Sequence, residues 1–147
     1  MNKLDIVKEK VFENLESKCY GYKKKQAYDH LIGVSNLCGI LALKRNLDVE
    51  ISMIIGLLHD YSTYILGSSF DHAHRSSMLS TKLLNDLNFN EQDITIITTA
   101  IYNHSDKEKI NDVYSELIKD ADVLNQYINQ KDAIFTKEYN KRLEKLL

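Results

Sequence analysis

The sequence contains no proline and only five glycines in 147 residues, so little in it would kink or interrupt a long helix. Two cysteines, Cys19 and Cys38, are too few for a disulfide framework, and Cys38 falls in an apolar helical pattern typical of a small core residue. No repeat, low-complexity tract or linker interrupts the chain. Since 44% of the residues are hydrophobic, the sequence predicts one all-α domain over residues 1–147 with a sizeable core.

The chain also lacks a strong charge of either sign. A formal net charge of -2 argues against general nucleic-acid binding, which depends on phosphate neutralisation. No apolar run approaches the length of a membrane span, and the polar start over residues 1–5 has no apolar signal-peptide core. We therefore expect a cytoplasmic protein that does not bind a membrane.

Residues 51–60 hold the most informative pattern. Apolar residues at 51, 54, 55 and 58 keep the spacing of a helix that faces a core, and this stripe runs directly into His59 and Asp60. An ionised carboxylate at the end of a buried stripe is costly unless a base or a metal ion meets it. An imidazole and a carboxylate together suit Zn, Mn or Fe, although taken alone the pair could equally lie on the surface at a helix end.

The same periodicity predicts about six or seven helices in all. The other expected helices span residues 3–18, 26–44, 71–86, 90–102, 112–129 and 131–147, with a polar loop over 61–70. Gly21 is expected to help end the first helix, and Asp48, Asp71 and Asn90 are expected N-caps. The helix over 112–129 should bury Val113, Leu117, Ala121, Leu124 and Ile128, and the last helix should only pack against the core.

The five histidines divide into two sets. His30, His59, His72 and His104 lie at inward positions near helix ends or beside apolar stripes, whereas His74 is turned by about 200° from His72 and should face away. Four inward histidines accompanied by acidic residues favour a metal site over ordinary core histidines. Asp120 and Asp122 flank the stripe of their helix on opposite sides, and periodicity does not decide which of them points inward.

The order His30, His59-Asp60, Asp122 resembles the H…HD…D signature of the HD superfamily of metal-dependent phosphohydrolases, a family of compact helical domains. The context Ala121-Asp122-Val123-Leu124 is similar to that of the family's last aspartate, which favours Asp122 over Asp120. His72, with Ser76-Ser77 where Gly-Ala is commoner, resembles the H-x-x-x-G-A element of members that bind two metals, and His104 resembles their next histidine. The resemblance covers roughly residues 26–128 and extends to small bacterial hydrolases of symmetrical dinucleoside tetraphosphates.

This resemblance implies a divalent-metal cofactor, with two ions expected and no choice among Fe, Mn, Zn, Ni and Mg. The implied metal ligands are His30, His59, Asp60, His72, His104 and Asp122, with Asp60 also catalytic because it would bridge the two ions. Arg75, one turn from His72, is the best candidate to bind a substrate phosphate, and Lys107 is a second candidate in a loop otherwise expected to be solvated.

The function implied is hydrolysis of a phosphate ester or anhydride in a nucleotide or related metabolite by metal-activated water. The partner would be a small phosphorylated substrate, and a homodimer is compatible with the sequence. Two alternatives stay open: a di-iron oxygenase of the same superfamily, and a nucleotide-binding regulatory domain without turnover. The intact ligand set argues against the regulatory domain.

Overall fold

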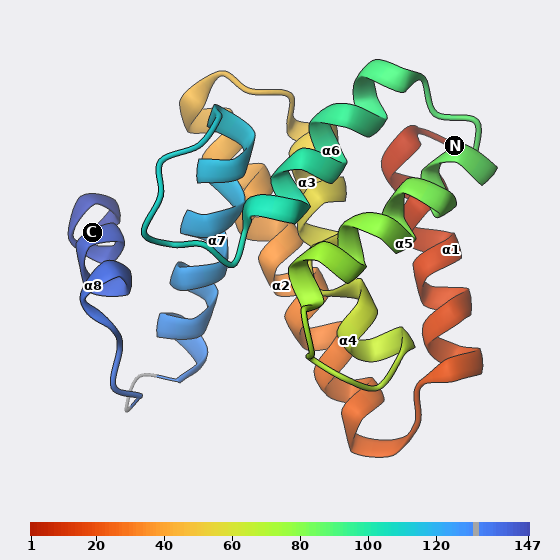
Figure 1. Cartoon of the computed structure of the whole chain (residues 1–147), viewed down its shortest axis with the longest axis horizontal. Coiled ribbons are helices and arrows are strands. Elements are labelled where there is room, and N and C mark those ends of the chain that lie inside the picture. Colours follow the sequence, from red (N-terminus) through yellow and green to blue (C-terminus); the bar gives the residue numbers. More distant parts are fainter. Residues whose placement is uncertain (131–132) are drawn as a thin grey trace.

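The computed structural model of the protein describes residues 1–130 and 133–147, and these residues form helices and no strand. Seven helices have ten or more residues and α4 has five. In chain order they are α1 (Lys3–Lys18), α2 (Gly21–Arg45), α3 (Val49–Leu58), α4 (Tyr61–Ile65), α5 (His72–Asp86), α6 (Glu91–Asn103), α7 (Val113–Asn129) and α8 (Lys137–Leu146). The predicted all-α class is confirmed, and Figure 1 shows the arrangement.

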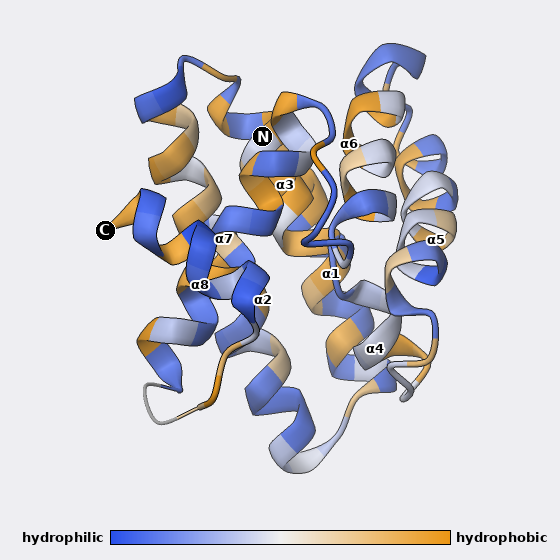
Figure 2. Cartoon of the chain, turned by 60° about the vertical axis from the view of Figure 1, so that its left-hand side comes forward, coloured by the Kyte–Doolittle hydropathy of each residue, from blue (hydrophilic) through white to orange (hydrophobic). Residues whose placement is uncertain are grey.

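Helix α3 forms the centre of the molecule. It packs most extensively on α2 and also contacts α1, α5, α6 and α7. Five of its apolar side chains are buried, each stabilising the fold by about 1.5–3 kcal/mol: Ile51, Ile54, Ile55, Leu57 and Leu58. Figure 2 shows this hydrophobic centre among helices whose outer faces are mostly hydrophilic. None of the described helices combines the length and the apolar character needed to cross a membrane.

Gly56 allows α3 to approach α2 very closely. A Cβ atom at this position would lie 2.6 Å from the Cα and 2.9 Å from the backbone nitrogen of Ser35. The Ser35 hydroxyl donates a hydrogen bond to the Met53 carbonyl at 2.8 Å, which ties the two helices together at the same level. The contact fixes the C-terminal end of α3 against α2.

The ends of α3 and α6 place two of the candidate ligands. The predicted N-caps of these two helices are confirmed, because Asp48 accepts from Ile51 N at 2.9 Å and Asn90 accepts from Asp93 N at 2.8 Å. Each helix then ends directly before a histidine, so that His59 and His104 occupy the C-cap positions of α3 and α6. Both imidazoles are buried there.

Two predicted boundaries in the first half of the chain are wrong. Helix α2 begins at Gly21, five residues earlier than expected, because a φ of +60° at Gly21 turns the chain directly into the next helix. The segment 61–70 is not wholly a loop, since it contains α4. Contacts with α5 stabilise this short helix: Ser62 N donates to Ser76 Oγ at 2.9 Å, and Ser62 Oγ donates to the His72 carbonyl at 3.1 Å.

Asp71 occupies the position before α5 but is not the expected side-chain cap. Its backbone is left-handed, with φ 48°, and its side chain makes no capping bond. Its carboxylate instead lies 2.9 Å from His74 Nδ1. The Asp71 carboxylate, which the sequence pattern assigned to the backbone N–H groups of α5, therefore interacts with the His74 side chain instead.

Two expectations for the C-terminal helices also need correction. Val113 and Ile128 of α7 are exposed, whereas Lys119 is completely buried, its ammonium donating to Lys109 O at 2.9 Å and Asn111 Oδ1 at 2.6 Å. The last helix begins at Lys137, after Thr136 caps it by accepting from Tyr139 N. Residues 131–132, where that helix was expected to start, lie outside the described residues.

Candidate metal centre

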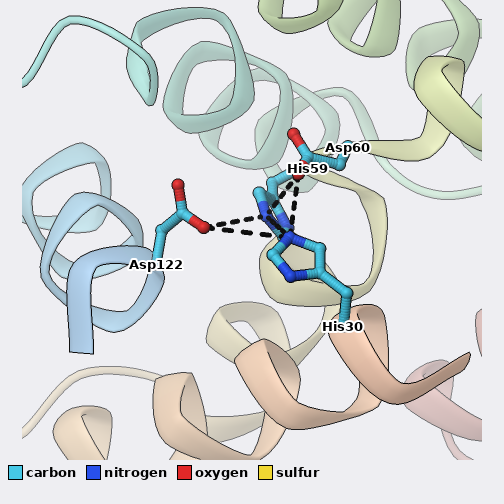
Figure 3. Close-up of side chains that lie close together, drawn as sticks. All are labelled: His30, His59, Asp60 and Asp122. Atoms are coloured by element: carbon cyan, nitrogen blue, oxygen red, sulfur yellow. Dashed lines mark hydrogen bonds and ion pairs between the residues drawn. The ribbon is translucent and has the colours of Figure 1, made fainter. Parts of the chain in front are cut away.

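Four predicted ligands converge between α2, the end of α3 and α7 (Figure 3). His30 Nε2 lies 2.8 Å from Asp60 Oδ2, 3.1 Å from His59 Nε2 and 3.8 Å from Asp122 Oδ1. His59 Nε2 lies 3.5 Å from the same Asp122 oxygen. One donor atom from each of these residues falls within 4.8 Å of the others, a spacing that suits a single metal ion.

A second group forms on the other side of Asp60. Asp60 Oδ1 lies 3.2 Å from His104 Nε2 and 3.5 Å from His72 Nε2. The rings of His72 and His104 meet edge to face, with 5.1 Å between their centroids. The two carboxylate oxygens of Asp60 thus face different groups, which is the arrangement needed to bridge two ions.

The two buried histidines are held in one orientation by backbone carbonyls. Nδ1 of His59 is 2.7 Å from Gly56 O, and Nδ1 of His104 is 2.7 Å from Ile101 O. A carbonyl only accepts, so each Nδ1 carries the proton and each Nε2 faces the carboxylates. Backbone support of this kind is the usual outer shell of histidine metal ligands, because it fixes both the tautomer and the ring orientation.

The carboxylates of Asp60 and Asp122 favour positive charge in the centre. Burial alone would lower the pKa of His59, but Asp60 and Asp122 raise that pKa to about 10. Burial opposes ionisation of Asp122, yet Lys107 and His59 hold its pKa well below the usual range. At His104 burial prevails and lowers the pKa. A divalent cation could therefore replace the proton on His59, and the donor set fits such an ion.

The two candidate phosphate-binding residues differ in their surroundings. Lys107 is buried, contrary to the expectation of a solvated loop, and its Nζ donates to His104 O at 2.6 Å and to Asp122 Oδ2 at 3.0 Å. Arg75 is partly exposed and donates from Nη1 to Phe70 O at 3.2 Å. Neither side chain is among the ligand groups.

The structure distinguishes two pairs of nearby residues: His72 and His74, of which periodicity predicted His72 to face inward, and Asp120 and Asp122, between which periodicity did not choose. His74 is turned away from the centre, with nearly half of its side chain exposed, and stacks on Tyr102 at a centroid distance of 4.0 Å. Asp120 lies 2.7 Å from Arg45 Nη2 and 2.9 Å from Arg142 Nη1, outside both groups. His72 and Asp122 are the members of these pairs that approach the other donors.

Sequence reasoning missed a polar cavity beside the first group. The cavity has a volume of about 400 Å³ and is lined by Gln26, Asp29, His30, Tyr64, Asp122, Asn125, Gln126, Asn129 and Gln130. Asn125 is buried, and its amide nitrogen lies 3.4 Å from His30 Nδ1. The available signal was its position three residues after Asp122, which places both on one side of α7.

Residues 27–126 match the family described as HD domain, and the chain belongs to this family. The match includes all six predicted ligands, and its limits lie close to the expected range of 26–128.

Proteins similar to this chain include two curated ribonucleases Y. That of Sulfurimonas denitrificans is 30% identical over 100 residues, which cover 68% of this chain and 18% of the relative. That of Geobacter sulfurreducens is 30% identical over 124 residues, covering 83% and 22% respectively. The chain thus spans about a fifth of the length of these relatives.

The fold also resembles a crystal structure of a predicted HD superfamily hydrolase from an uncultured Thermotogales bacterium. The TM-score is 0.70 at 18% sequence identity, and the similarity covers 99% of this chain and 90% of the other. At this identity the likeness concerns the fold, and it extends to helices α1 and α8 outside the region that matches the family.

Proposed function

We propose that this protein is a metal-dependent phosphohydrolase that cleaves a phosphate ester or anhydride of a nucleotide or a related metabolite. One observation carries the proposal: six side chains from five separate parts of the chain converge into two ligand groups that share Asp60. Membership of the HD-domain family, and the fold shared with a protein described as a predicted hydrolase, support the same reaction class.

In this proposal His30, His59, Asp60 and Asp122 would hold one ion, and Asp60, His72 and His104 would hold a second. Two bound divalent cations supply an activated water and neutralise charge on the phosphoryl oxygens. The protein contributes fixed geometry, because the carbonyls of Gly56 and Ile101 prevent the two buried imidazoles from turning. Asp60 would serve both groups, since Oδ2 faces His30 and Oδ1 faces His72 and His104.

The polar cavity supports a nucleotide as the substrate. Its volume falls within the range of about 300–1,000 Å³ typical of small-molecule sites. Its lining includes five carboxamide side chains, which both donate and accept hydrogen bonds and suit the edges of a base or the hydroxyls of a sugar. The relatives named ribonuclease Y are consistent with a phosphate joined to a nucleoside. Arg75, one turn beyond His72, is the candidate for contact with the phosphate.

The test is metal analysis joined to a phosphohydrolase screen. Protein stripped with a chelator and reloaded singly with Mn²⁺, Fe²⁺, Zn²⁺, Ni²⁺ or Mg²⁺ is assayed on p-nitrophenyl phosphate esters, nucleoside monophosphates, dinucleoside tetraphosphates and short RNA. We expect turnover that the chelator removes and at least one metal restores. Turnover indifferent to the chelator, or none with any metal, would contradict the proposal, and a mixed-valence iron signal without phosphohydrolase activity would favour an oxygenase.

Substitution of Asp60 by Asn supplies the matched comparison. Asp60→Asn keeps the shape of the side chain but removes the shared charge, so both metal content and turnover should fall. Asp86→Asn is the control, because this exposed carboxylate pairs with Lys82 at 3.0 Å and belongs to neither ligand group. The control should retain both properties.

A further inference from the structure

Lys107 places a buried positive charge against one of the candidate ligands. Its side chain is 6% exposed, and its ammonium lies 3.0 Å from Asp122 Oδ2 and 5.7 Å from the centre of the Tyr139 ring. A second hydrogen bond, 2.6 Å long, runs to the carbonyl of His104, a candidate ligand of the other group. The ammonium therefore contacts one residue of each ligand group: the side chain of Asp122 and the backbone of His104.

The two oxygens of the Asp122 carboxylate face different partners. Oδ1 faces the imidazoles, 3.5 Å from His59 Nε2 and 3.8 Å from His30 Nε2, while Oδ2 accepts from Lys107. Oδ1 is therefore the oxygen directed at the first group, while the ammonium competes for Oδ2. The ammonium and that ion would both draw on the same negative charge, and the two cations would repel each other across the carboxylate.

Helix α8 holds Lys107 in this position. Arg142 Nη2 and Nε donate to the Lys107 carbonyl at 2.9 and 3.3 Å, and Arg142 Nη1 donates to Glu116 and Asp120 at 3.1 and 2.9 Å. Arg142 is itself buried. This helix lies beyond residues 27–126, so a part of the chain outside the region that matches the family holds the backbone of Lys107. The prediction that the last helix only packs thus overlooked its link to the centre.

We propose that Lys107 is a positioning residue that acts as an internal counter-cation. It restricts Asp122 to a single coordinating oxygen, stabilises the carboxylates when no ion is bound, and weakens metal binding so that the ion exchanges readily. This inference rests on the proposed metal centre. Removal of the ammonium should therefore destabilise the metal-free protein and tighten the binding of metal.

The test compares the wild type with Lys107→Met in protein freed of metal by a chelator. Isothermal titration with Mn²⁺ should give a dissociation constant at least about tenfold lower in the variant, because the repulsion between the cations has gone. Thermal unfolding should begin from a lower Tm without metal and rise more on addition of Mn²⁺ than it does in the wild type. A residue with a purely structural role would lower stability without tightening metal binding.

Two further variants complete the design. Lys107→Gln keeps a donor for Asp122 without the charge, so it should also bind Mn²⁺ more tightly and provides the test if the Met variant does not fold. Lys109→Met is the matched control, since this lysine is exposed and pairs with Asp106 at 3.3 Å, and it should leave the affinity unchanged. Unchanged or weaker Mn²⁺ binding in the Gln and Met variants would refute the role of Lys107, whereas a wild type that binds no metal would refute the metal centre as well.

Discussion

His72 and His74 provide the sharpest test of the candidate centre, because they lie two residues apart on α5 and differ in their surroundings. His72 Nε2 is 3.5 Å from Asp60 Oδ1, and its ring meets that of His104. His74 faces Asp71 and Tyr102 instead. Substituting each by Ala removes the same chemical group from either side of one helix turn.

His72→Ala should change metal content and activity more than stability. The second group loses one of its three donors, so we expect the variant to bind about one ion per chain where the wild type binds two. One cation cannot stabilise both the attacking and the leaving oxygen, and turnover should fall at least about a hundredfold, which corresponds to about 2.7 kcal/mol in the barrier. A third of the His72 side chain is exposed, so the cost in unfolding free energy should be about 1 kcal/mol.

His74→Ala should cost a similar amount of stability but leave the metal in place. It removes a half-exposed contact with the Asp71 carboxylate, which stabilises by at most about 1 kcal/mol, and a ring stacked on Tyr102, which contributes about 0.5–1.5 kcal/mol. A total near 1 kcal/mol would lower the Tm by roughly 2–4 °C in a domain of this size. Metal content and turnover should stay at the wild-type level.

Elemental analysis, thermal unfolding and turnover on the same preparations decide the matter. The expected result is a difference in metal content and turnover at similar stability: His72→Ala loses metal and activity, while His74→Ala keeps both. Full metal content in the His72 variant would refute the second ligand group. Loss of metal in the His74 variant would show that α5 presents the other histidine to Asp60.

Three further predictions follow from buried contacts. His59→Ala should remove metal and activity together while far-UV circular dichroism stays helical, since the apolar core stabilises the fold; full metal content would show that the site is misplaced. Burial opposes ionisation of Glu116, but hydrogen bonds from Lys119 and Asn111 and the charge of Arg142 lower its pKa below 4.5. The resulting stabilisation is present above that value and is lost as the pH falls through the pKa of Glu116 in the folded protein. In Glu116→Gln the Tm should therefore fall less steeply as the pH is lowered. An unchanged dependence of Tm on pH would contradict this role. Gly56→Ala should destabilise by about 1–3 kcal/mol in urea unfolding, because its Cβ meets the Ser35 backbone, and a neutral result would mean that the two helices separate at little cost.

The helices could be predicted from sequence because helical periodicity is a local property. The buried stripe of α3 and the caps Asp48 and Asn90 agree with the structure. The errors fall where distant contacts decide the conformation. Helix α4 depends on bonds between Ser62 and α5, and Asp71 turns to His74 instead of capping its helix.

The candidate site shows the same division. The sequence by itself determined that His30, His59, His72 and His104 lie on inward sides, since the helical period sets the direction of each side chain relative to its own helix. Family resemblance favoured Asp122 over Asp120, and only the packing of α7 against α2 showed one carboxylate beside His59 and the other beside Arg45. Lys107 could not have been placed from its charged loop. Lys107 is buried because its ammonium pairs with Asp122 and its carbonyl accepts from Arg142 of α8. These partners come from distant parts of the chain, so tertiary packing and not local sequence brings them together.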